Sequence, residues 1–292
     1  MPLLAYNKDN REEMIFAMNK KKYEERIDQF RILDDTFMNE VFRDQKELVQ
    51  MVLRTILRIQ DLEVTNVAIQ DSYTNMQGRG IRIDISAEDS EGRLYALEIQ
   101  RAKYGAGSKR ARYNMSLMDV SHTEEGTVIP DPAETYIIFI TETDFYNAGL
   151  SVYHVERMIL ELKQPFDDKG HIVYVNGAYV GDDPIGILMH DFRCSDPDKM
   201  RNEMLRKRVS ELKGSPEWRE TMCQAMEETR EEGRLEGRLE GRLEGRLEGQ
   251  EETKVMDYYT MLSLGVEEAT LRSGLGITDE LLAKYPHFRP KQ

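Results

Sequence analysis

Cysteine is almost absent from this sequence. Cys194 and Cys223 are the two cysteines among 292 residues, and they form no CxxC pair. Because a disulfide framework or a cysteine zinc site needs closely patterned cysteines, we expect two reduced thiols. The five histidines also stand singly, without the HxH or HxxxH spacing of a histidine metal site. The sequence therefore does not indicate metal binding by sulfur or imidazole.

Long apolar runs are lacking as well. The longest purely apolar runs have five residues, among them Tyr136–Ile140, which has the length of a buried strand, whereas a membrane-spanning helix needs about 20 such residues. The N-terminus also lacks the apolar core of a signal peptide. We therefore expect no membrane association and a cytoplasmic location.

Positive charge is in the minority, because 40 lysines and arginines stand against 54 acidic residues and leave a net charge of −14. Such a chain is not expected to coat nucleic acid through bulk electrostatics. One local exception follows residue 100, where no acid intervenes between Glu98 and Asp119. The basic residues of this stretch are Arg101, Lys103, Lys109, Arg110 and Arg112. They are a candidate contact for a phosphate backbone, although a charge run can also be only a solvated surface.

The clearest local pattern lies between residues 81 and 103. Two runs, 81–86 and 95–100, alternate apolar and polar residues, and Gly92 ends the short polar loop between them. A period of two with such a loop predicts a β-hairpin. If Asp89 pairs with Arg93 across the loop, Asp84 lies opposite Glu98, give or take one position for a bulge. Gln100 then shares the face of Glu98.

Two facing carboxylates with an amide beside them, among apolar neighbours, are costly unless a positive charge lies between them. A divalent metal ion would supply that charge. A solvated outer face of an antiparallel sheet gives the same sequence pattern, and in that case the two acids only contact water. The spacing alone leaves both interpretations open.

The sequence around these residues resembles that of a known family. Asp84 followed by Glu98-Ile99-Gln100 resembles the split signature of PD-(D/E)XK nucleases, in the variant with glutamine in place of the final lysine. The stretches GRGIRIDISAED, EIQRAKYGAGSKRARYNMSL and LDDTFMNEVF resemble the Rpn (recombination-promoting nuclease) group, the PD-(D/E)XK nuclease family transposases of bacteria. The resemblance runs from about residue 30 to the C-terminus. Met38 departs from it, because the family has a lysine at that position.

The resemblance implies an α/β fold, a restriction-endonuclease-like mixed sheet flanked by helices, and a metal-dependent DNA endonuclease. Asp84 and Glu98 would be metal ligands with the main-chain carbonyl of Ile99, and Gln100 would orient the attacking water. Glu40 is a further candidate ligand, as an acid of the first helix. Mg²⁺ is the expected ion, with Mn²⁺ as a substitute, because all ligands are hard oxygens. The implied context is recombination, transposition or phage defence.

An alternative from another functional class stays open at this stage. The chain could be a catalytically inactive DNA-binding or oligomerising protein that keeps the nuclease fold. A cleavage assay with and without metal ion separates the two.

Composition divides the chain into four segments. We expect an N-terminal arm over residues 1–30, a nuclease-like domain over 31–195, a helical arm over 196–249 and a short helical, helix-turn-helix-like tail over 250–292. The domain should open with one helix from Asp34 to about Ile59. The arm contains GRLE four times, a unit without Glu–Arg pairs at helical spacing, and its glycines weaken an isolated helix. The tail is expected to mediate self-association.

Overall fold

A computed structural model describes residues 19–74, 80–101, 103–123 and 132–289, without the side chains of Lys103 and Tyr104. The contacts divide the chain into two units, residues 1–223 and 224–292, and each is described here by itself. None of the helices in these described ranges is long and apolar enough to cross a membrane.

The first unit contains a six-stranded mixed sheet in the order β1-β2-β3-β4-β8-β5. Strands β1, β2 and β3 are antiparallel neighbours, β3, β4 and β8 run parallel, and β5 is antiparallel to β8. The strands are β1 Val64–Thr74, β2 Gly80–Asp89, β3 Leu94–Gln100, β4 Thr135–Thr141, β5 Val152–Val155 and β8 Gly170–Asn176, with a small β6 Met158–Ile159 and β7 Gln164–Pro165 hairpin between β5 and β8. This confirms the predicted mixed sheet.

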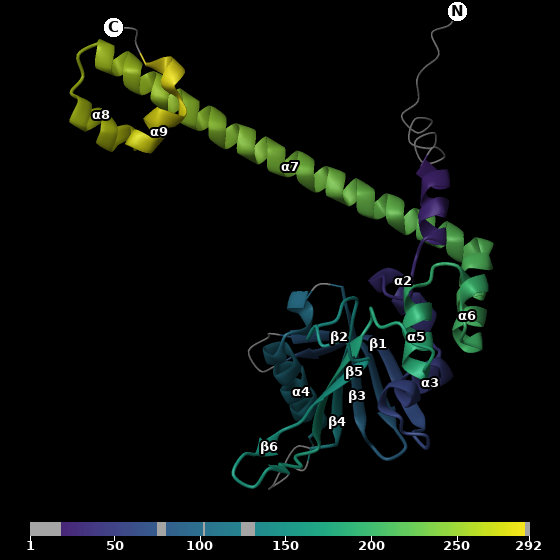
Figure 1. Ribbon diagram of the computed structural model, residues 1–292. Coiled ribbons are helices and arrows are strands. Elements are labelled where there is room, and N and C mark those ends of the chain that lie inside the picture. Colours follow the sequence, from purple (N-terminus) through teal and green to yellow (C-terminus); the bar gives the residue numbers. More distant parts are fainter. Residues whose placement is uncertain (1–18, 75–79, 102, 124–131, 290–292) are drawn as a thin grey trace, which may run out of the picture. The chain divides into compact units, whose positions relative to one another are not determined.

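Helices cover both faces of the sheet (Figure 1). Residues 19–28 are also helical. The helices and turns of this unit are α2 Asp35–Phe42, α3 Lys46–Leu57, η1 Lys103–Ala106, α4 Ser108–His122, α5 Pro184–Arg193, η2 Pro197–Lys199, α6 Glu203–Gly214 and the first residues of α7 Pro216–Ser263. Helix α4 packs on one face, and α2, α3, α5 and α6 pack on the other.

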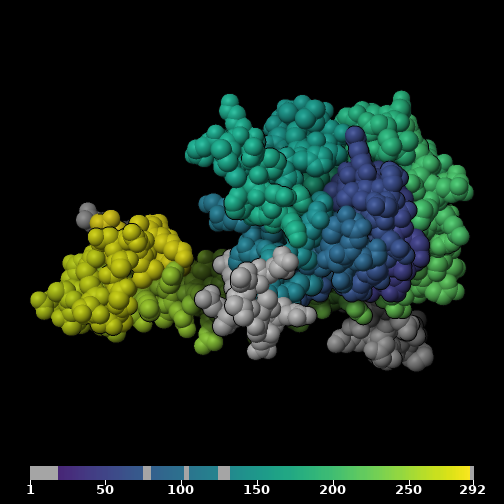
Figure 2. Space-filling model, turned by 90° about the horizontal axis from the view of Figure 1, so that it is seen from below, coloured from purple at the N-terminus to yellow at the C-terminus, as the bar shows by residue number. Residues whose placement is uncertain are grey.

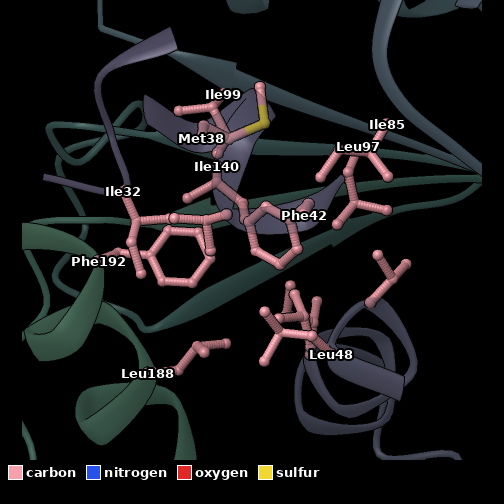
Figure 3. Close-up of a cluster of buried hydrophobic side chains, with 14 of the residues drawn as sticks. Ile32, Met38, Phe42, Leu48, Ile85, Leu97, Ile99, Ile140, Leu188 and Phe192 are labelled. Carbon is pink, nitrogen blue, oxygen red and sulfur yellow. The ribbon is translucent and has the colours of Figure 1, made fainter. Parts of the chain in front are cut away.

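The larger core lies between the sheet and α2, α3, α5 and α6. Its side chains include Met38, Phe42 and Leu48 from the helices and Ile85 and Ile140 from the strands (Figure 3). Burial of such side chains is the main favourable term in folding. The core fixes α2 against β2 and β3, next to the predicted site.

The smaller core lies under α4. Ala111, Met115 and Met118 recur at helical spacing and contact the strand residues Ile137 and Phe139. This stripe fixes the rotation of α4, so the polar residues between its members have defined directions.

The N-terminal and C-terminal segments of this unit lie side by side on its surface, in purple-blue and green in Figure 2. Arg208 of α6 donates to the carbonyl oxygens of Glu40 and Val41 at 2.7 and 3.1 Å. Lys213, nearly buried, donates to the carbonyl oxygens of Asp28 and Phe30 at 2.8 Å. Residues after 195 therefore complete the packing of the nuclease-like domain.

The predicted single helix from Asp34 to Ile59 is wrong, because the chain forms α2 and α3 with a break at residues 43–45. Asp44 adopts a left-handed backbone conformation, φ 55°, which an α-helix cannot contain. The apolar stripe continues across the break because both helices cover the same core, and for this reason periodicity did not reveal it.

The second unit is formed by the rest of α7 with α8 Glu268–Leu275, α9 Asp279–Lys284 and η3 Pro286–Phe288. The helix continues through the whole GRLE repeat. Gly265 and Gly276, with φ of 86° and 65°, end α7 and α8. A small core closes the tail, and it consists of Val255, Tyr258, Leu271, Ile277 and Tyr285.

Candidate active site

The predicted hairpin is confirmed with its register. The Asp89 N–H donates to the Arg93 carbonyl oxygen at 3.1 Å, and Gly92 has φ 76°. The β2–β3 ladder ends at the pair Ile85 and Leu97. One step further along the same register lie Asp84 and Glu98, where the two strands separate. The site is built at this split.

Asp84 bridges the gap between the separating strands. Its Oδ2 accepts the Ile99 N–H at 2.8 Å, and its Oδ1 lies 3.4 Å from the Nε2 of Gln70. Burial raises the pKa of the Asp84 carboxyl, the Ile99 N–H opposes that rise, and the charge of Asp35 adds to it. The carboxylate is thus held in a fixed direction, and among the described residues no cationic side chain hydrogen-bonds to it.

Glu98 is completely buried and is held by three donors. Its Oε1 accepts from Asn114 Nδ2 at 2.9 Å, and its Oε2 accepts from Arg110 at 2.9 Å and from Gln100 Nε2 at 3.1 Å. Burial raises the pKa of Glu98 to about 7 although the Arg110 guanidinium lowers it, and the charge of Asp84 adds to the rise. Two carboxyls with raised pKa values at one point are typical of a functional site.

Gln100 lies against the backbone of Gly105, in the turn between β3 and α4. A Cβ on residue 105 would lie 1.7 Å from the Gln100 Oε1. Glycine is therefore required for this close approach. The approach confines the Gln100 amide to the side of Glu98.

Asp84 and Gln100 border a hollow of about 1180 Å³. It lies between α2, the β1–β2–β3 edge and the start of α4. The lining residues are Asp35, Thr36, Asn39, Gln70, Gly80, Ile81, Arg82, Asp84, Ile99, Gln100, Arg101, Lys109, Arg110, Tyr113 and Asn114. Glu98 is absent from this lining because Arg110 and Asn114 cover it. The volume is sufficient for a nucleotide-sized segment of a polymer.

Helix α2 contributes an acid that sequence reasoning missed. Asp35 and Asn39 line the hollow, whereas Glu40 pairs with Arg43 at 2.9 Å and does not. Asp35 and Asn39 are four residues apart and share one helix face, while Glu40 is turned about 100° from Asn39. The acid of α2 that lines the hollow is therefore Asp35 rather than Glu40, and the two polar residues four apart, 35 and 39, were the available sequence signal.

Gln70 was also missed. It lies between the β1–β2 pairs formed by Ile69 with Ile85 and by Asp71 with Ile83, and its φ is 55°. Such a conformation is uncommon for a residue with a side chain. Its Nε2 also donates to the Asn39 Oδ1 at 3.1 Å. The register of β1 decides its position, and no short sequence motif encodes that register.

The basic residues after the hairpin separate into groups. Lys109 and Arg110 line the hollow, and so does Arg101, which is already paired with Asp34 and Glu142 at 3.3 and 3.4 Å. Arg112 is exposed outside the lining. The side chain of Lys103 lies outside the described residues.

A divalent cation fits the donor set. Within the described ranges no cluster contains three or more His, Cys, Asp or Glu suited to a metal ion, so two carboxylates would be completed by carbonyl and water oxygens, as Mg²⁺ prefers. The Ile99 N–H points to Asp84, and its carbonyl shares that side of the strand. The buried Asn114 Oδ1 has no hydrogen-bond donor among the described residues and suits a bound water.

Comparison with known proteins gives one finding. The model of the PD-(D/E)XK nuclease family transposases matches residues 32–178, about half of the chain. Neither the curated proteins nor the solved structures contain a significant match. The matched range includes the whole split hairpin, α4 and all six strands of the sheet. With its restriction-endonuclease-like mixed sheet, the chain belongs to the PD-(D/E)XK nuclease family transposases.

Proposed function

We propose that this protein is a Mg²⁺-dependent DNA endonuclease that hydrolyses phosphodiester bonds. The family supports a nuclease-type function on DNA with a divalent metal ion. One observation carries the finer proposal. The split between β2 and β3 brings Asp84, Glu98 and Gln100 together, and Asp84 and Gln100 line a hollow whose wall also presents Lys109 and Arg110.

In this proposal Asp84 and Glu98, with the Ile99 carbonyl, hold the ion. A divalent ion at this place would stabilise negative charge on the phosphoryl group and lower the pKa of water; Mn²⁺ would substitute for Mg²⁺. Gln100 is a neutral amide that can donate and accept but cannot take up a proton, so its role is to orient the attacking water. Its bond to Glu98 and the backbone of Gly105 hold it in place.

The basic wall of the hollow would hold the DNA. Lys109 and Arg110 start α4 next to the site, and Arg101 and Arg112 extend the positive surface. Arg110 also donates to Glu98, so one guanidinium would link the acid to a phosphate oxygen. Because the whole chain carries a net charge of −14, we expect contacts to be confined to this surface.

The test is cleavage of supercoiled plasmid with and without Mg²⁺ or Mn²⁺. Wild type should nick or linearise the plasmid only with the ion, and Asp84→Ala should lose this activity. Asp198→Ala, an exposed acid of η2, is the matched control and should cut like wild type. Equal cutting by Asp84→Ala contradicts the proposed site. DNA binding without cutting by wild type favours the inactive DNA-binding alternative.

We also propose that the tail, residues 250–292, mediates self-association. Four of its large apolar side chains are exposed by 40 to 78%: Met256, Met261, Leu264 and Val266. Exposed apolar side chains that lie together often mark a surface that binds another protein. A cytoplasmic location and a role in bacterial recombination, transposition or phage defence belong to the same proposal and rest on the family resemblance.

A further inference from the structure

Asn114 is a completely buried polar residue in the middle of α4, and the mechanism above leaves it without a role. Its Nδ2 donates to the Glu98 Oε1 at 2.9 Å, while Arg110, one turn earlier, reaches the other oxygen at 2.9 Å. Residues four apart in a helix share one face. A single turn of α4 therefore holds both oxygens of the carboxylate.

The second polar atom of Asn114, its Oδ1, is buried and has no hydrogen-bond donor within the part of the chain that the structure describes. Exchanging the two ends of the amide does not remove the problem, because an oxygen would then face the carboxylate of Glu98. A buried acceptor without a donor disfavours folding. In native proteins such an atom commonly marks a bound water, an ion or a functional constraint.

The position of this atom indicates what would supply the donor. Asn114 lines the hollow together with Asp84, Ile99 and Gln100. Water that enters the hollow has two protons to donate, and a hydrated cation held by carboxylates keeps several waters. A water beside Glu98 would supply the donor that the buried Oδ1 lacks.

We infer that Asn114 is a positioning residue that fixes the orientation of Glu98 for cation binding and accepts a hydrogen bond from a water in the hollow. This inference rests on the proposed function. Groups that hydrogen-bond to metal ligands typically change metal affinity 10- to 100-fold when they are removed. In this role the Nδ2 of Asn114 holds Glu98, and the Oδ1 of the same amide accepts from the water.

The test measures Mn²⁺ binding by titration calorimetry, with the melting temperature in EDTA as a separate measurement. Asn114→Leu keeps the branched skeleton of the side chain but removes both polar groups, whereas Asn114→Ala leaves space in which water can replace the amide. We expect the Mn²⁺ dissociation constant to rise about 10- to 100-fold in Asn114→Leu and by a smaller factor in Asn114→Ala. Met118→Leu, a volume-conserving change in the same helix, should bind Mn²⁺ like wild type.

If Asn114 served only packing, the effects of the two variants would have the opposite order. Asn114→Leu would then bind Mn²⁺ like wild type, and Asn114→Ala alone would suffer through a lower melting temperature. Unchanged Mn²⁺ affinity in both folded variants overturns the inference while leaving the proposed function intact. Absence of Mn²⁺ binding by wild type instead overturns the proposed function, and the inference with it.

Discussion

At the scale of single residues, Glu98 shows how burial and function oppose each other. It is completely buried, its pKa is raised to about 7, and three side chains donate to it. Burying a carboxylate is costly unless positive charge and donors compensate it. This unfavourable burial of Glu98 occurs where the two strands of the hairpin separate. Such a cost in stability is expected of a residue that serves chemistry.

Glu98→Gln should change the pH dependence of stability in EDTA. Burial raises the pKa of Glu98 from 4.5 to about 7, so its contribution favours folding below pH 4.5 and is lost as the pH rises through about 7. Wild type and variant should be similarly stable near pH 5. At pH 8 the variant should be more stable by about 3 kcal/mol, an upper value from this shift. Urea unfolding at both pH values measures the difference.

The melting temperature of Glu98→Gln should respond only weakly to Mg²⁺. Mg²⁺ should raise the melting temperature of wild type more than that of Glu98→Gln, because the variant lacks one ligand charge. Cleavage of plasmid DNA should be lost. The prediction fails if the difference in unfolding free energy between wild type and Glu98→Gln does not vary with pH, or if the variant cleaves like wild type. Either result would mean that the charge of Glu98 has no role in the site.

Gly105→Ala should damage the site through Gln100 alone. The backbone of Gly105 is outside the left-handed region, so alanine is tolerated there, but its Cβ would displace the Gln100 Oε1, which lies 1.7 Å away. We expect cleavage to fall about 100-fold with little change in melting temperature. In a Gln100→Ala background, Gly105→Ala should cause no further loss. Additive losses would show that Gly105 acts independently of Gln100.

At the scale of secondary-structure elements, α4 and α7 show two different uses of a helix. In α4 an apolar stripe packs on the sheet and thereby directs Arg110 and Asn114 at Glu98. In α7 the repeat is almost entirely exposed, and among the described residues nothing outside the helix's own neighbouring backbone lies within 4 Å of a Cβ built on its glycines. Packing of its apolar stripe on the sheet positions the first helix, whereas the repeat depends on intrinsic helix propensity.

Replacing Gly237, Gly241 and Gly245 by alanine should stabilise the repeat. Each exposed helical glycine costs about 1 kcal/mol relative to alanine, and no neighbour obstructs the added methyl groups. Amide hydrogen exchange over residues 233–249 should slow by about 100-fold in the triple variant, since about 3 kcal/mol is available. Plasmid cleavage should not change. Unaltered exchange would mean that the repeat opens together with a larger unit.

At the scale of the whole molecule, the chain consists of two units with separate cores. All residues proposed for chemistry lie in the first unit, whereas the small core of the second unit is made by the tail residues Val255, Tyr258, Leu271, Ile277 and Tyr285. Removal of the repeat or of the tail therefore leaves the sheet and both of its helical layers intact. We expect cleavage and self-association to be separable functions.

Truncation after Gly249 should lower the molar mass measured by light scattering, because it removes the tail core, and single-turnover cleavage should persist. Deletion of residues 233–248 should likewise preserve cleavage chemistry. If the truncated protein keeps its mass but loses DNA affinity, the tail binds DNA rather than a second copy. Loss of cleavage in a folded 233–248 deletion would place the repeat in the active site.

The sequence by itself determined the central hairpin, its register and the neighbourhood of Asp84, Glu98 and Gln100. These followed from alternation and from a short loop with glycine, which are local consequences of backbone geometry. The apolar run Tyr136–Ile140 likewise indicated the buried strand β4, because an unbroken apolar run of this length is typical of a strand that is buried on both faces.

Only the tertiary structure decided which distant residues complete the site. Asp35, Asn39 and Gln70 reach the hollow because the core sets α2 against β2, and Asn114 reaches Glu98 because α4 is packed in one rotation. Glu40 has the right chemistry but lies on another face of α2. Contacts between elements depend on packing over long sequence separations, and a single sequence carries no local signal for them.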